Sequence, residues 1–340
     1  MSDIAVAHIS SPFVTAYPWS SGFGTKYTNP STLPSDIGRG VAFSPNGNDI
    51  AVAHNGSPFV TAYPWSSGFG TKYTNPSTLP PDTGRGVAFS PNGNDIAVAH
   101  SDSPFVTAYP WSSGFGTKYT DPSTTPSNTS FGVAFSPDGN DIAVAHRNSP
   151  EVTAYPWSSG FGTKYTDPST TPTGIGWAVA FSPDGNDIAV AHSNSPFVTA
   201  YPWSSGFGTK YTNPSTLPSN HGNNVAFSPN GNDIAVAHVS SPFVTAYPWS
   251  SGFGTKYTNP GTLPASNGRS VAFSPDGNDI AVALASSPFV TAYPWSSGFG
   301  TKYTDPSTLP PNICFGVAFR PQSAPPSSYN PAFAHRRLLL

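Results

Sequence analysis

The sequence consists of one 46-residue stretch repeated along almost the whole chain. The triplet Val-Ala-Phe begins at Val41 and recurs every 46 residues, and Asp-Ile-Ala-Val-Ala recurs with the same step from Asp3. Seven copies of each element are present. Tandem units of about 20–50 residues are typical of solenoids and propellers, in which each unit packs on its neighbours and the array shares one core. The repeat therefore predicts a single domain.

Each unit contains four short runs that favour β-strands. The first, 41–43, ends in Ser-Pro and is followed by Asn46-Gly47, a strong signal for a tight hairpin turn. The second, 49–54, alternates larger residues with Asp and Ala. The third is 59–63, where Pro64 then interrupts pairing because it lacks an N–H. The fourth, outer run is 70–74.

Seven units of four antiparallel strands predict an all-β, seven-bladed β-propeller. Alanine on one sheet face and larger residues on the other suit blades that stack small against large. The chain starts at a second strand, residues 3–8, and its seventh Val-Ala-Phe, 317–319, stands near the other end. We expect these two to pair and close the ring. The propeller domain is predicted to span 1–321, and the Pro/Ser-rich segment 322–340 to be a loose tail or a partner-binding peptide.

Composition excludes several classes of function. Charged residues make up only 9% of the chain, the formal net charge is −3, and lysine occurs once per repeat without a basic cluster. A nucleic-acid binder needs a concentrated cationic face, so none is expected. Cys314 is the only cysteine, which excludes an internal disulfide and a cysteine metal site. No signal peptide or membrane span is visible, and the compartment, cytoplasmic or virion-associated, stays open.

The repeat resembles the WD40 family, in a highly repetitive form similar to bacterial and phage propellers. The likeness rests on Val-Ala-Phe-Ser-Pro-Asp-Gly, as in 133–139, followed by an alternating strand, and it covers residues 3 to 319. Tyr63 stands where that family carries its signature Trp, and Pro64 where it carries Asp. The Gly-His pair before the first strand is absent, so the family's buried hydrogen-bond network does not carry over.

The resemblance implies a non-enzymatic protein, because WD40-like propellers are mostly binding platforms. We therefore expect a monomeric recognition or scaffold module without cofactors, which presents a variable face to a partner protein or surface ligand. Two alternatives stay open beside it. One is a lectin-like or phage receptor-binding module for glycans, and the other is an engineered or recently amplified repeat protein without a defined ligand.

Asp49 and His54 could be taken for parts of a catalytic set, but both recur along the chain. Asp is present in all seven units and His in six, with Leu284 in the seventh place. A catalytic site needs one asymmetric constellation, whereas a residue present in every blade more plausibly completes a hydrogen bond in every blade. We predict no catalytic residue and no metal site. Trp65 and its equivalents are expected in blade packing, with an exposed stacking platform as the alternative.

The seven copies differ mainly in two places, the turn after the second strand and the segment before the first. In a four-stranded meander both lie on one face of the disc, and loops on a rigid scaffold commonly carry binding residues. Two residues before each Val-Ala-Phe, the chain offers arginines and aromatic rings that suit a sugar or an anion. This ring of candidate ligand-binding residues at the channel mouth comprises Arg39, Arg85, Phe131, Trp177, Asn223, Arg269 and Phe315.

Drift after duplication would also concentrate differences in loops, so this variation has two interpretations. A hydrolase or lyase on the propeller is a further hypothesis, and it needs a unique cluster of carboxylates or histidines at the channel mouth. Only His221, Asp36 and Asp82 meet that description, and they belong to three separate repeats. Glu151, the only glutamate, replaces the phenylalanine of other repeats near the same face.

Overall fold

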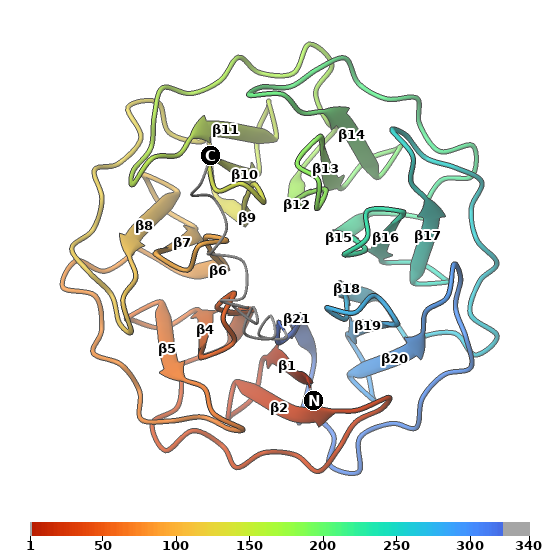
Figure 1. The fold of residues 1–340 in the computed structure, drawn as a ribbon, viewed down its shortest axis with the longest axis horizontal. Coiled ribbons are helices and arrows are strands. Elements are labelled where there is room, and N and C mark those ends of the chain that lie inside the picture. Colours follow the sequence, from red (N-terminus) through yellow and green to blue (C-terminus); the bar gives the residue numbers. More distant parts are fainter. Residues whose placement is uncertain (1, 322–340) are drawn as a thin grey trace, which may run out of the picture.

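Seven blades are arranged in a ring around a central axis in the computed structural model, which describes residues 2–321 (Figure 1). Each blade is an antiparallel three-stranded sheet, and the described residues form no helix. The predicted all-β, seven-bladed propeller is confirmed. The expected tail, 322–340, lies outside the described residues. Residues 2–321 contain no helix that could cross a membrane.

The strands fall into three concentric sets. The inner strands are β3 (Gly38–Phe43), β6 (Gly84–Phe89), β9 (Ser130–Phe135), β12 (Gly176–Phe181), β15 (Gly222–Phe227), β18 (Gly268–Phe273) and β21 (Cys314–Phe319). The middle strands are β1 (Ser2–His8), β4 (Asp49–His54), β7 (Asp95–His100), β10 (Asp141–His146), β13 (Asp187–His192), β16 (Asp233–His238) and β19 (Asp279–Leu284). The outer strands are β2 (Val14–Trp19), β5 (Val60–Pro64), β8 (Val106–Pro110), β11 (Val152–Pro156), β14 (Val198–Pro202), β17 (Val244–Pro248) and β20 (Val290–Pro294).

The segment predicted as the fourth strand of each blade forms no strand in residues 2–321. The segment after β5 is held by Gly70 N–H donating to Pro64 O at 2.8 Å and by Tyr73 N–H donating to Ala62 O at 2.9 Å. These two bonds do not continue as a β-ladder, because Pro64 has no N–H that could donate a hydrogen bond back to the segment. The outer layer is therefore an irregular strap rather than a strand, and the prediction of four strands per blade is corrected to three.

Blades stack by placing large side chains against small ones, as the alternation predicts. Ile50 and Val52 on β4 pack against Ala5 and Ala7 on β1 of the preceding blade. All four side chains are fully buried, and the same contact recurs around the ring. Because alanine leaves room for the larger partner, neighbouring sheets approach closely enough to exclude water.

An aspartate in each blade ties that blade to the next. Asp3 accepts the Tyr27 hydroxyl at 2.7 Å through Oδ1 and the Trp65 indole N–H at 2.9 Å through Oδ2. The other six aspartates of the middle strands make the same two contacts. These bonds explain why Asp and Trp recur in every repeat, and they place Trp65 in blade packing, as predicted.

The ring closes between the first and last described strands. β21 pairs antiparallel with β1, with Val317 opposite Val6 and Phe319 opposite Ile4, so the predicted seam is present (Figure 1). Arg320 strengthens it, since its Nε donates to Gly47 O at 2.7 Å and its Nη1 lies 3.2 Å from Asp3 Oδ2. The other repeats carry serine at this position, for example Ser44, so Arg320 belongs specifically to the seam.

Candidate functional site

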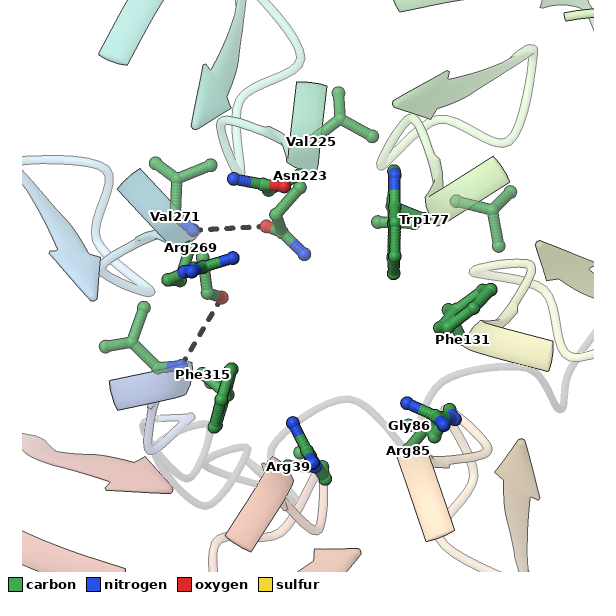
Figure 2. A pocket seen from close by; sticks show the side chains of 18 of the residues that line it. Arg39, Arg85, Gly86, Phe131, Trp177, Asn223, Val225, Arg269, Val271 and Phe315 are labelled. Atoms are coloured by element: carbon green, nitrogen blue, oxygen red, sulfur yellow. Dashed lines mark hydrogen bonds between the residues drawn. The ribbon is translucent and has the colours of Figure 1, made fainter. Parts of the chain in front are cut away.

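One cavity of about 570 Å³ opens at the centre of the ring, at the start of the inner strands. Each of the seven candidate residues is the second residue of an inner strand, and all seven line this cavity (Figure 2). They are Arg39, Arg85, Phe131, Trp177, Asn223, Arg269 and Phe315. That they bind a ligand stays a prediction.

A β-bulge explains why these side chains reach the channel. In β3, Gly38 pairs with His54 and Gly40 with Ala53, which leaves Arg39 as an extra residue without a partner in the register. The same shift occurs in the six other blades. A bulge interrupts the alternation of a strand and redirects the extra side chain. The blade scaffold thus offers seven positions that can vary without disturbing the core.

The two variable segments of each repeat meet at this face, as expected. Arg39 Nε donates to Asn55 Oδ1 at 2.8 Å, and Arg85 Nε donates to Ser101 Oγ at 2.7 Å. Both acceptors lie in the turn after the middle strand. These two turns therefore orient Arg39 and Arg85, and within residues 2–321 the terminal amino groups of both guanidinium groups have no hydrogen-bond partner and can donate to a ligand.

Arginines and aromatic rings form two clusters on one side of the cavity. Arg39 lies over the ring of Phe315, with 4.5 Å between guanidinium carbon and ring centroid, and Arg269 lies 5.9 Å from the same ring. Arg85 and Arg147 lie 5.0 and 5.8 Å from the ring of Phe131. We call the sector from Arg269 through Phe315, Arg39 and Arg85 to Phe131 and Arg147 the cationic arc.

The positive charges of the cationic arc are partly buried and repel one another. Burial lowers the pKa values of Arg39, Arg85 and Arg269, and the nearby positive charges of Arg39 and Arg147 lower that of Arg85 further. Within residues 2–321, none of these four arginines forms an ion pair with a carboxylate. The Nε of Arg269 is also buried without a hydrogen-bond partner in that range. Asp36 and Asp82, which are not in ion-pair contact, partly offset the lowering of the pKa values of Arg39 and Arg85. Partly buried cations that lack an ion-pair partner favour an anionic ligand.

The opposite side of the cavity is neutral and centres on Trp177. Its indole N–H donates to His221 Nε2 at 2.6 Å, and its ring lies 4.3 Å from that of Phe131. Because an indole can only donate, His221 Nε2 is the acceptor and the imidazole is neutral. Burial, and secondarily the charge of Arg269, lowers the pKa of His221. Asn223 completes this side and donates to Gly268 O at 2.7 Å.

The other residues considered for catalysis lie elsewhere. Asp36 and Asp82 do not line the cavity; each caps the N–H of the next residue, at 2.7 and 2.6 Å. Glu151 is only 7% exposed and also lies outside the lining. Of the recurring histidines, His54 is typical: fully buried, with Nε2 2.8 Å from Thr61 Oγ1 in its own blade.

Sequence reasoning missed Arg147 at the cavity. It stands in the turn after β10, where the copies differ, but sequence alone does not show that this turn reaches the ring of Phe131. The signal was the positive charge, which none of the six equivalent turn positions carries. Among the described residues, no group of three His, Cys, Asp or Glu side chains is arranged to hold a metal ion.

Comparison with known proteins identifies the fold. No family model and no curated protein matches the chain. Among solved structures, it resembles a periplasmic gluconolactonase of Pseudomonas aeruginosa (TM-score 0.73, 15% identity) and a Bacteroides uniformis protein provisionally assigned as a 6-phosphogluconolactonase (TM-score 0.69, 15% identity). Each comparison covers 94% of this chain and 99% of the other. A Lactobacillus plantarum protein matches with a TM-score of 0.74, 14% identity and the same coverage. These likenesses support a β-propeller, and membership of the WD40 family has no support.

These comparisons overturn the functional prediction. A non-enzymatic scaffold was inferred from the resemblance to WD40 platforms, yet proteins that share this ring over nearly their whole length are described as lactonases. The prediction of a non-enzymatic binding module is wrong, and so are its lectin-like and ligand-free alternatives. The resemblance led to the error, whereas the repetition itself correctly marks the recurring Asp and His as structural.

Proposed function

We propose that this protein hydrolyses a small sugar lactone that carries an anionic group, in the cavity at the centre of the ring. The observation that carries the proposal is the cationic arc, four arginines around one cavity without carboxylate partners in residues 2–321. The lactonases with a similar fold suggest the reaction. Of the two lactones in their names, the phosphorylated one matches the charge of the arc.

The two sides of the cavity suit the two parts of such a substrate. Guanidinium groups bind an anionic substituent through charge-assisted hydrogen bonds. The sugar ring would lie toward Trp177, whose flat face offers apolar contact beside a polar edge. A cavity of about 570 Å³ is within the usual range for small-molecule sites.

Hydrolysis of a lactone needs a proton acceptor and a stabiliser of negative charge. Water adds to the carbonyl carbon, the ring C–O bond breaks, and an open-chain hydroxy acid is released. His221 is neutral and would take the proton of a water that replaces the Trp177 indole N–H at its Nε2, then return that proton to the ring oxygen. An arginine of the cationic arc would stabilise the oxyanion that forms on the carbonyl oxygen.

The test compares two lactones after correction for their spontaneous hydrolysis. We expect turnover of 6-phosphogluconolactone with a higher kcat/KM than that of gluconolactone. The double variant Arg39→Gln/Arg85→Gln should reduce kcat/KM for the phosphorylated lactone by about 10- to 100-fold per lost contact, mainly through KM, because a hydrogen bond to a charged group contributes about 1.5–3 kcal/mol.

Lys118→Gln is the matched control. It also removes a positive charge, but from an outer ion pair with Asp121, and it should leave the kinetics unchanged. His221→Gln should lower kcat for both lactones. If neither lactone is hydrolysed faster than in buffer, the proposal is refuted. Equal kcat/KM values for the two lactones would refute the assigned role of the cationic arc.

A further inference from the structure

One backbone N–H of each inner strand points away from its own blade. Val271 N–H donates to Asn224 Oδ1 at 3.1 Å, and Val317 N–H donates to Ser270 Oγ at 3.4 Å, in each case on the neighbouring blade (Figure 2, dashed lines). Antiparallel pairing alternates between residues that bond to the partner strand and residues that do not. The equivalent valine pairs in the same register in every blade, for example Val41 opposite Val52, so its N–H points outward throughout.

Four blades leave this N–H opposite a glycine. The position of Asn224 and Ser270 is occupied by Gly40, Gly86, Gly132 and Gly316 in those blades and by Ala178 in another. A Cβ on Gly40 would lie 3.4 Å from Val87 N, and one on Gly316 would lie 3.3 Å from Val41 N. We call each such place a niche: a valine N–H without a hydrogen-bond partner in residues 2–321, beside a glycine of the preceding blade. Asn224 and Ser270 show that an acceptor oxygen fits there.

Three of the four niches lie within the cationic arc, and the fourth, between Gly132 and Val179, lies where Phe131 meets Trp177. The niche between Gly40 and Val87 is flanked by Arg39, the neighbour of Gly40 in β3, and by Arg85, two residues before Val87 in β6. All four of these residues line the cavity. The filled places are that of Asn224, between Asn223 and Arg269, and that of Ser270, between Arg269 and Phe315 within the cationic arc. The niche between Gly40 and Val87 is therefore the one that has an arginine on each side.

We propose that the niche between Gly40 and Val87 is a binding site for a phosphate group. One phosphate oxygen takes the place that Ser270 Oγ occupies in its own niche and accepts the N–H of Val87. The other oxygens bind the guanidinium groups of Arg39 and Arg85. Backbone N–H groups beside glycine, combined with basic side chains, are a recurrent arrangement for phosphate. The inference rests on the proposed function only in assigning this phosphate to a sugar lactone.

The charge of the sector favours phosphate over other oxygen ligands. A hydroxyl group could accept the Val87 N–H but would leave the arginines uncompensated. A phosphate monoester carries about −1.5 to −2 charges at neutral pH and three acceptor oxygens. It therefore matches one backbone donor and two guanidinium groups whose mutual repulsion lowers the pKa of Arg85.

The experiment titrates the whole protein with inorganic phosphate by isothermal calorimetry, at an ionic strength held constant with sodium chloride. We expect the parent to bind phosphate and Gly40→Ser to bind it at least about tenfold more weakly, because the new hydroxyl fills the niche. Ser270→Gly is the control: it opens a niche between Arg269 and Phe315 and leaves the Gly40 niche intact. Its affinity should be no weaker than that of the parent.

A parent that does not bind phosphate overturns the inference, as does a folded Gly40→Ser variant with parental affinity. A Cβ on Gly40 would lie 3.0 Å from Arg85 O, so thermal unfolding of the variant is measured alongside. If that variant does not fold, a crystal structure of the parent with phosphate decides: phosphorus placed away from Val87 N refutes the niche. If the protein hydrolyses the lactone but does not bind phosphate, only this inference is refuted. If it binds phosphate but hydrolyses neither lactone, only the proposed function is refuted.

Discussion

The middle strand of each blade ends in a histidine, with one exception. In six blades its Nε2 lies 2.8 Å from a threonine hydroxyl of the outer strand, as between His54 and Thr61. In the seventh blade Leu284 takes this place, and among the described residues Thr291 Oγ1 is buried without a partner. A buried hydroxyl that loses its hydrogen bond costs about 1–3 kcal/mol. The exception therefore marks the least satisfied blade.

Leu284→His should restore the missing bond. We expect the free energy of unfolding at pH 7.5 to rise by about 1 kcal/mol, the usual net gain from one intramolecular hydrogen bond. Urea unfolding measures it, with His54→Leu as the reciprocal variant that should lose a similar amount. Stabilisation by His54→Leu would show that apolar packing, rather than the bond to threonine, decides which residue this position prefers.

At the scale of the strand, the propeller could be predicted because its signals are local and repeated. The period, the Asn-Gly and Asp-Gly turns, and the order of the pieces sufficed for the blades and the seam. The fourth strand could not be predicted with the same certainty. A run such as 70–74 has strand-like composition, but whether it forms a ladder depends on the edge it meets, and Pro64 removes a donor from that edge.

The seam offers a test of the closed ring. A chain that ends at Gly316 loses most of β21 and Arg320, and thereby exposes the edge of β1 and breaks the contacts to Gly47 and Asp3. We expect its unfolding midpoint to fall by many degrees, whereas a chain that ends at Pro321 keeps every described strand and should unfold like the parent. Thermal unfolding of the two proteins compares them directly. Matching midpoints would be incompatible with a seam that holds the ring closed.

Across the whole molecule, the candidate site was only partly predictable. Its seven bulge positions follow from repeat alignment, because the innermost strand must surround the channel. The contact of Arg147 with Phe131 and the niche between Gly40 and Val87 did not follow, since they depend on how closely neighbouring blades approach. The prediction of a non-enzymatic protein failed for a different reason: it was taken over from the resemblance to one family, and one fold carries many functions.

The ring should lose stability on mild acidification. Burial lowers the pKa of the six recurring histidines to about 4, whereas unfolded histidine titrates near 6.5. Between these values the unfolded chain binds protons that the native state does not, so stability falls as pH falls from 6.5 toward 4. Each buried histidine contributes up to about 1.4 kcal/mol per pH unit within that window.

Unfolding midpoints between pH 6.5 and 5 measure this dependence, because most carboxylates have not yet titrated there. His54→Leu should make the dependence shallower. A midpoint that stays constant over this interval would contradict the buried, neutral state of these histidines.

Because β1 pairs with β21, the ring can close only after β21 has been synthesised. Residues 2–8 are synthesised before the rest of the ring, and their inner partner strand follows about 300 residues later. Phe315 and Gly316, which belong to that late strand, also form part of the cavity wall. Until they arrive, the cationic arc is open on one side and the first blade has an unpaired edge. Completion of the cavity wall and completion of the ring are thus a single event. A ligand of the proposed kind would select only those molecules in which synthesis has passed β21.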